Sequence, residues 1–146
     1  MARKKNALTS YFVATLPTDP ATASYLELAK WISDVSDDSD ESTEDTGYYD
    51  GDGTPTTDVI SIAERYTFEG FYDSEDPAMK LIASLKRETG EARKVMFKKV
   101  EADGEEAAGV ATVTDIVASG GAATDYATFS CAITWDKKPT VTQATP

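Results

Sequence analysis

The sequence contains no histidine and a single cysteine, Cys131, among its 146 residues. Histidine is the usual general base near neutral pH and the commonest transition-metal ligand. Its absence excludes Ser-His and Cys-His nucleophile pairs and the zinc patterns that need histidine. One cysteine cannot form an internal disulfide, which suits a reducing compartment. We therefore expect no enzymatic activity, no catalytic residues, no cofactor and no metal site.

The chain also has no apolar run of about 18 residues, the length of a membrane-spanning helix, so we expect no membrane insertion. Its length fits a single domain, residues 1–146, which buries roughly two thirds of its unfolded surface. The basic start and the Thr- and Pro-containing end predict flexible arms at about 1–9 and 137–146.

Basic residues are missing from one long acidic stretch. Residues 34–58 contain no Lys or Arg and ten carboxylates: Asp34, Asp37, Asp38, Asp40, Glu41, Glu44, Asp45, Asp50, Asp52 and Asp58. The chain has 26 acidic and 14 basic residues, so the remainder holds 16 acids against 14 bases. A loop this long is usually functional or disordered. We expect a projecting loop at 36–57, with the acidity of the chain concentrated there.

Three interpretations of this loop are open: a solvated acidic loop, a calcium site and an interface. The EF-hand pattern needs Gly at the sixth and Glu at the twelfth position, and neither 38–42 nor 50–53 begins such a pattern. A glycosidase pair needs carboxylates at a fixed separation, which a mobile loop does not provide. Tyr48 and Tyr49 favour an interface, because tyrosine offers large contact area with few rotatable bonds.

Other residues that suggest function have simpler structural explanations. Trp31 and Trp135 are expected in the core or in subunit contacts. Cys131 lies on the apolar face of a strand and is expected to be buried. The basic residues at 93–94 and 98–99 could suggest a nucleic-acid site, but the net charge of −12 argues against phosphate binding. The favoured explanation is that outward lysines block the pairing of strand edges.

Alternating apolar and polar residues predict strands at 10–16, 59–72, 93–102, 110–118 and 125–136. Residues 25–35 are a further strand candidate with a helix as the alternative. One face of 59–72 carries Ile60, Ile62, Tyr66, Phe68 and Tyr72. Gly70 marks a bulge or bend in this strand. Asp103-Gly104 and Gly120-Gly121 supply turns, so the last three strands should pair as a meander.

One helix is indicated by Ala78, Leu81, Ile82 and Leu85, which share one helical face. Asp76 is the expected N-cap, Pro77 the first helical residue and Gly90 the end, with Lys86 and Arg87 in the last turn. The whole pattern predicts a mainly β protein: an antiparallel β-sandwich or barrel with one flanking α-helix and a long acidic loop.

Several of these segments also resemble a known family. The stretch Tyr48-Tyr49-Asp50-Gly51-Asp52-Gly53-Thr54-Pro55-Thr56-Thr57-Asp58-Val59 is similar to the motif before the long central strand of tail tube proteins (major tail proteins) of long-tailed bacteriophages. Residues 66–72, then Asp76-Pro77-Ala78, and the closing pattern of 111–117 through 129–135 resemble the same family. The resemblance covers roughly 25–136 in the same order. The acidic run 37–45 departs from it.

The resemblance implies a structural virion protein whose β-sandwich subunits form hexameric rings that stack into a hollow tail tube for genome delivery. Its long loop and termini would make inter-subunit and inter-ring contacts: Tyr48, Tyr49, Asp50, Gly51, Asp52, Gly53, Thr54, Pro55, Arg3, Lys4 and Lys5. Implied partners are further copies, the tape measure, tail tip and terminator proteins, and passing DNA that is not specifically bound. The implied location is the virion tail, after synthesis in the bacterial host cytoplasm.

A second function remains open beside this one. A monomeric β-sandwich binding module, for calcium-dependent adhesion or carbohydrate recognition, is compatible with the same strand pattern. Concentration-dependent assembly distinguishes the two, because only the tube subunit must associate with itself.

Overall fold

The computed structural model describes residues 5, 8–15 and 25–142, and it is mainly β. Along the chain the elements are β1 (Ser10–Thr15), β2 (Leu26–Glu27), β3 (Ile32–Asp37), β4 (Asp40–Thr46), β5 (Thr56–Ala63), β6 (Arg65–Phe71), α1 (Pro77–Ser84), the 3-10 helix η3 (Gly90–Arg93), β7 (Lys94–Val100), β8 (Glu106–Val117), β9 (Thr128–Trp135) and β10 (Thr140–Thr142). Arg3, Lys4 and the ends of both predicted arms lie outside the described residues.

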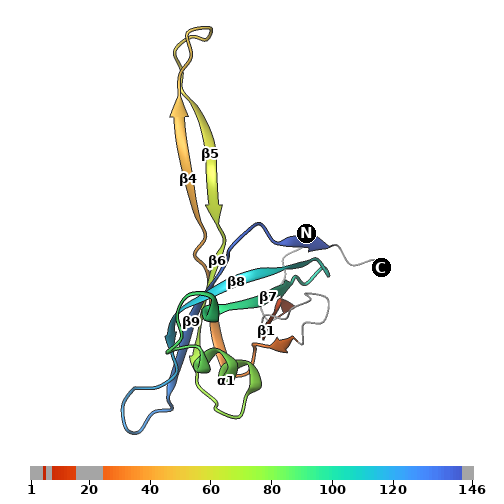
Figure 1. The fold of residues 1–146 in the computed structure, drawn as a ribbon, viewed down its shortest axis with the longest axis vertical. Coiled ribbons are helices and arrows are strands. Elements are labelled where there is room, and N and C mark those ends of the chain that lie inside the picture. Colours follow the sequence, from red (N-terminus) through yellow and green to blue (C-terminus); the bar gives the residue numbers. More distant parts are fainter. Residues whose placement is uncertain (1–4, 6–7, 16–24, 143–146) are drawn as a thin grey trace.

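Most strands belong to one curled antiparallel sheet in the order β2-β1-β7-β8-β9-β6-β3, with β10 added beside β8 (Figure 1). The meander β7-β8-β9 pairs as the sequence predicts. Its turn glycines adopt positive φ, 95° at Gly104 and 100° at Gly120. Glycine reaches this region without steric cost, which explains these turn sequences.

The core lies on one face of the curled sheet. Its largest fully buried side chains include Phe68, Phe97 and Phe129, contributed by β6, β7 and β9. The inward alternation predicted for β9 is confirmed: Phe129, Cys131, Ile133 and Trp135 are all buried. The Trp135 indole nitrogen donates to the Phe97 carbonyl at 3.1 Å, so this polar group is satisfied inside the core.

The α1 helix begins as predicted but ends earlier. Asp76 is the N-cap: its carboxylate accepts from the Met79 amide at 3.3 Å, and Pro77 follows at the first position. Met79 and Ile82 are fully buried, whereas Leu81 is only partly buried. The helix ends at Ser84, so Lys86 and Arg87 do not occupy its last turn.

Arg93 stabilises the irregular segment that follows α1. Its guanidinium donates to the carbonyls of Lys86 at 2.7 Å, Glu88 at 2.8 Å and Val113 at 3.1 Å. Two of these carbonyls belong to the segment predicted to be helical, and the third belongs to β8. Arg93 therefore satisfies backbone carbonyls of the irregular segment after α1 and connects this segment to β8.

The acidic segment is a β-hairpin and not a loop. β4 and β5 pair with each other from Asp40↔Ala63 to Thr46↔Thr56 and form a separate two-stranded sheet. Figure 1 shows this hairpin rising away from the main sheet. Charged residues disfavour strands weakly, and the regular pairing with β5 outweighs that preference here.

The strand expected at 59–72 is likewise two strands in two sheets. β5 ends at Ala63, β6 begins at Arg65, and Glu64 lies between them. The expected common face is therefore wrong: Tyr66 and Phe68 are buried, but Ile60 and Ile62 are exposed on the hairpin. The segment 25–35 forms β2 and β3, and no helix forms there.

The C-terminal segment also differs from the expected free arm. Thr140 and Thr142 pair with Ala108 and Glu106 of β8, so β10 extends the sheet. Threonine and valine favour this extended pairing, which the Pro- and Thr-rich composition obscured.

Candidate functional site

The large hydrophobic side chains that remain exposed gather mainly at two ends of the described structure. Five lie on the hairpin: Tyr48, Tyr49, Val59, Ile60 and Ile62. Four lie around the opposite ends of β3, β6, β8 and β9: Trp31, Phe71, Val117 and Tyr126. Contiguous exposed apolar surface commonly marks an interaction site. These two regions are the candidate functional surfaces.

A β-bulge makes the hairpin amphipathic. Ser42 pairs with Ser61, but Thr43 pairs with Val59, so Ile60 is the extra residue. Because side chains alternate along a strand, this extra residue resets the pattern. Val59, Ile60 and Ile62 consequently share one side of the hairpin, which we call the aliphatic face. They are 58%, 62% and 60% exposed.

The other side of the hairpin is polar and acidic. Glu44 lies directly opposite Asp58, and Asp40 opposite Ala63, on the side that also carries Ser42 and Ser61. Like charges directly opposite one another destabilise a two-stranded pair. One side of the hairpin thus carries Val59, Ile60 and Ile62 together with Glu41 and Asp45, and the other side carries only small, polar and acidic residues.

The predicted contact residues 48–55 come together as the connection at the tip of this hairpin. Tyr48 and Tyr49 are strongly exposed. Asp52 accepts from the Thr54 amide at 2.9 Å, and this hydrogen bond lowers the pKa of the Asp52 carboxyl. Gly53 adopts φ 89°, which most residues avoid. The tip is therefore a defined turn that presents two tyrosines.

Lys5 is exposed, and within the described residues no ion pair joins it to the tip. The structure therefore does not bring this predicted contact residue together with Tyr48 and its neighbours.

The base of the hairpin is held by backbone and side-chain contacts of Arg65. The Ser39 hydroxyl accepts from the Arg65 amide at 3.1 Å, and the Asp38 amide donates to the Arg65 carbonyl at 2.8 Å. The Arg65 guanidinium forms a 2.8 Å ion pair with Asp115, which lies at a bulge in β8 with φ 54°. These contacts connect the hairpin to the main sheet at the point where β3 ends and β6 begins.

The second surface, which we call the aromatic end, consists of Trp31, Phe71 and Tyr126. The Phe71 amide donates to the Trp31 carbonyl at 3.0 Å, and the Phe71 and Tyr126 rings meet edge to face at 6.0 Å. The three side chains are 56%, 44% and 81% exposed. Tryptophan and tyrosine are enriched among the residues that dominate binding energy at protein interfaces.

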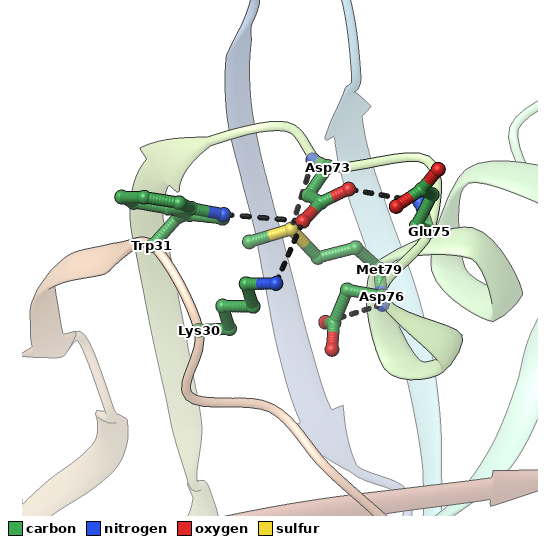
Figure 2. Close-up of polar contacts among 6 residues, drawn as sticks. All are labelled: Lys30, Trp31, Asp73, Glu75, Asp76 and Met79. Atoms are coloured by element: carbon green, nitrogen blue, oxygen red, sulfur yellow. Dashed lines mark hydrogen bonds and ion pairs between the residues drawn. The ribbon is translucent and has the colours of Figure 1, made fainter.

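Figure 2 shows how Trp31 is held. Its indole nitrogen donates to the Asp73 carboxylate at 3.2 Å, and Lys30 forms an ion pair with the same carboxylate at 3.2 Å. The Glu75 amide also donates to Asp73, and these hydrogen bonds lower the pKa of Asp73, the amide contributing most. The indole is thus fixed in position while much of its ring stays open to contact.

The lysines of β7 do not form a free basic patch. Lys94 pairs with Asp136 and Lys99 with Glu101. Lys98 lies between the rings of Phe12 and Tyr25, 4.9 and 4.4 Å from their centres. These contacts make the lysines part of the fold. The expected role of the lysines in blocking a strand edge is wrong, because β7 lies between β1 and β8 inside the sheet.

Cys131 is buried, and burial raises the pKa of its thiol to about 12. Within the described residues, no group of three or more Asp, Glu or Cys side chains is arranged to hold a metal ion. In the same part of the chain, no helix is long and apolar enough to cross a membrane.

The sequence predicts the contact residues at the hairpin tip but neither the aliphatic face nor the aromatic end. Trp31 and Trp135 are both expected in the core or in subunit contacts, and the structure separates them into an exposed and a buried tryptophan. Phe71 and Tyr126 carried no local signal, because only the pairing of β6 with β9 brings them together.

The sequence matches no protein-family model and no curated protein. Solved structures share its fold. A chain from the tail of an empty GTA particle with C6 symmetry is 11% identical, with a TM-score of 0.68 over 99% of this chain and 100% of that one. A chain from the virion of a native gene transfer agent (GTA) particle is 12% identical, with a TM-score of 0.66 over 97% and 99%.

A chain from an extracellular contractile injection system, in a sheath–tube complex in the extended state, is 15% identical. Its TM-score is 0.50 over 92% of this chain and 88% of that one. The chain therefore has a tail-tube-like fold, in agreement with the family resemblance of its sequence.

Proposed function

We propose that this protein is a structural subunit of a phage-like tail tube. In this proposal it assembles into hexameric rings that stack into a hollow conduit for genome delivery. The main support is the similarity of fold over the full length of both chains to a protein in a C6-symmetric particle tail. The tail-tube motifs in the sequence point to the same assembly independently of the structure.

The arrangement of the surfaces also supports self-assembly. The hairpin and the aromatic end lie at opposite ends of the described structure (Figure 1). Two different surfaces on one subunit give heterologous contacts, which close into rings or continue as filaments according to the rotation between copies. A tube of stacked rings uses both outcomes.

In this role the hairpin tip, including Tyr48 and Tyr49, contacts a neighbouring copy. The basic N-terminal residues Arg3, Lys4 and Lys5 contact acidic residues of a neighbouring copy. Other proposed partners are the tape measure, tail tip and terminator proteins. DNA passes without specific binding, because a net charge of −12 per subunit disfavours phosphate contacts. The proposed location is the virion tail after synthesis in the host cytoplasm, and the role is structural rather than enzymatic.

Sedimentation velocity of the purified protein over a hundredfold range of concentration tests this proposal. The tube subunit is expected to shift from small species to large assemblies, more readily as salt screens the repulsion between acidic subunits. A single small species at every concentration and salt would instead support the alternative of a monomeric binding module.

A further inference from the structure

The aromatic end faces away from the hairpin because of the strand order. β3 runs toward the hairpin and β6 runs back from it, so Ile32 and Phe71 stand at the far ends of these strands. Thr128, the first residue of β9, pairs with Phe71, which places the loop carrying Tyr126 at the same end. Figure 1 shows this loop, between β8 and β9, opposite the hairpin. A contact between the two surfaces therefore joins different copies.

The aromatic end has a backbone arrangement that fixes its exposed side chains. Trp31 adopts φ 64°, a conformation that is a genuine outlier for a bulky residue. Backbone outliers of this kind cluster at functional sites such as binding sites. The carboxylate of Asp73 then holds the indole edge, so the ring is preorganised at the surface.

Charge argues against pairing of the hairpin with another hairpin. Residues 34–58 carry ten carboxylates and no Lys or Arg, so two such segments in contact would repel strongly. The aromatic end instead has Lys30 beside it, 58% exposed and 5.9 Å from the centre of the Trp31 ring. Glu41 lies on the aliphatic side of the hairpin, opposite Ile62. Lys30 pairs with the Asp73 carboxylate, so that carboxylate is neutralised at the aromatic end, whereas no base within 34–58 neutralises the carboxylates of the hairpin. A hairpin is therefore repelled less by the aromatic end than by a second hairpin.

We propose that the aromatic end, Trp31, Phe71 and Tyr126, is the acceptor for the aliphatic face, Val59, Ile60 and Ile62, of a second copy of this chain. The contact buries the β-branched side chains of one subunit against the aromatic rings of the next. Its placement between successive rings rests on the proposed tube function. The contact itself is head to tail and repeats along the assembly.

Disulfide trapping of the full-length protein tests this contact. Ile60→Cys and Tyr126→Cys are mixed under oxidising conditions, and the mixed dimer is measured on non-reducing gels. The control mixes Ile60→Cys with Val141→Cys, a residue of β10 that is similarly exposed at 54%. Cys131 is buried with a raised pKa, so the wild type is expected to stay uncrosslinked.

The expected mixed dimer with Tyr126→Cys is at least tenfold more abundant than with Val141→Cys. A double Ile60→Cys, Tyr126→Cys variant should give a ladder of covalent multimers, since each copy then carries both halves. Yields equal to the control, or a dominant dimer of Ile60→Cys with itself, would overturn the acceptor. If either of these two results is obtained with samples that form tubes, the acceptor is wrong and the tube function stands. A ladder from protein that forms no tubes would support the contact and overturn the tube.

Discussion

The carbonyl oxygen of Trp31 occupies the space that a side chain would need at Gly70. A Cβ at Gly70 would stand 2.0 Å from that oxygen and 2.8 Å from the Cα of Ile32. This approach lets the Trp31 carbonyl accept from the Phe71 amide at 3.0 Å. It also coincides with a register shift in β3 between Ile32 and Asp34. The position of the exposed indole therefore depends on a glycine in the neighbouring strand.

Gly70→Ala should destabilise the protein by about 3 kcal/mol, because backbone and not a flexible side chain must move to admit the methyl group. Gly109→Ala is the control: its Cβ would meet neighbours only at 3.5 Å, so its cost should stay below about 1 kcal/mol. Urea denaturation of both variants measures the difference. Equal stabilities would show that the close approach is not a constraint.

The buried face of α1 should carry much of the stability of the domain. Ile82→Ala is expected to cost about 2–5 kcal/mol, because it removes fully buried methyl groups and leaves a cavity. Leu81→Ala should cost less, since Leu81 is only partly buried. Chemical denaturation ranks the two variants. A larger loss for Leu81→Ala would mean that the helix packs with a different face inward.

Asp136 should contribute to acid sensitivity. Burial opposes its ionisation, but hydrogen bonds from Lys94 and Thr112 outweigh it and lower the pKa of the carboxyl. Because the pKa is lower in the folded state, ionised Asp136 stabilises the fold at pH values above the ordinary aspartate pKa. This stabilisation is lost as the pH falls through the folded-state pKa. Asp136→Asn should therefore be less stable at neutral pH.

The same variant should lose less stability than wild type on acidification from about pH 5 to pH 2. Unfolding free energies measured by urea titration across this range provide the test, with Asp125→Asn in the exposed β8–β9 loop as the control. Parallel curves for wild type and Asp136→Asn would exclude a contribution from this carboxylate.

The sequence predicted features that local interactions determine. The cap formed by Asp76, the helical position of Pro77 and the positive φ of Gly104 all follow from neighbouring residues. The alternation of β9 was readable because one face of that strand is buried along its length. These elements needed no knowledge of distant contacts.

The hairpin could not be predicted in the same way. Apolar alternation continues through Ile60, Ile62, Tyr66 and Phe68, so the break at Glu64 leaves no periodic signal. Whether β5 stays in the main sheet depends on its pairing with β4, whose composition is typical of a loop. The aromatic end was hidden for a related reason, since antiparallel pairing joins residues far apart in the sequence.

Removal of the hairpin should separate folding from assembly. Replacing residues 39–64 by Asn-Gly would join β3 to β6 through a two-residue turn, since these strands are already antiparallel neighbours. Every residue of β5 is exposed, so the loss of unfolding free energy should be about 1 kcal/mol or less. Assembly, followed by sedimentation, should be lost. Long tubes from this variant would show that the hairpin is not a connector.

Cryo-electron microscopy of the assembled protein, averaged in end-on view, tests whether this protein forms a hexameric tube. We expect hollow rings with sixfold symmetry, together with side views of stacked rings in which the hairpin spans neighbouring rings. Folded protein that yields only small solid particles, at high concentration and in added salt, would contradict this expectation.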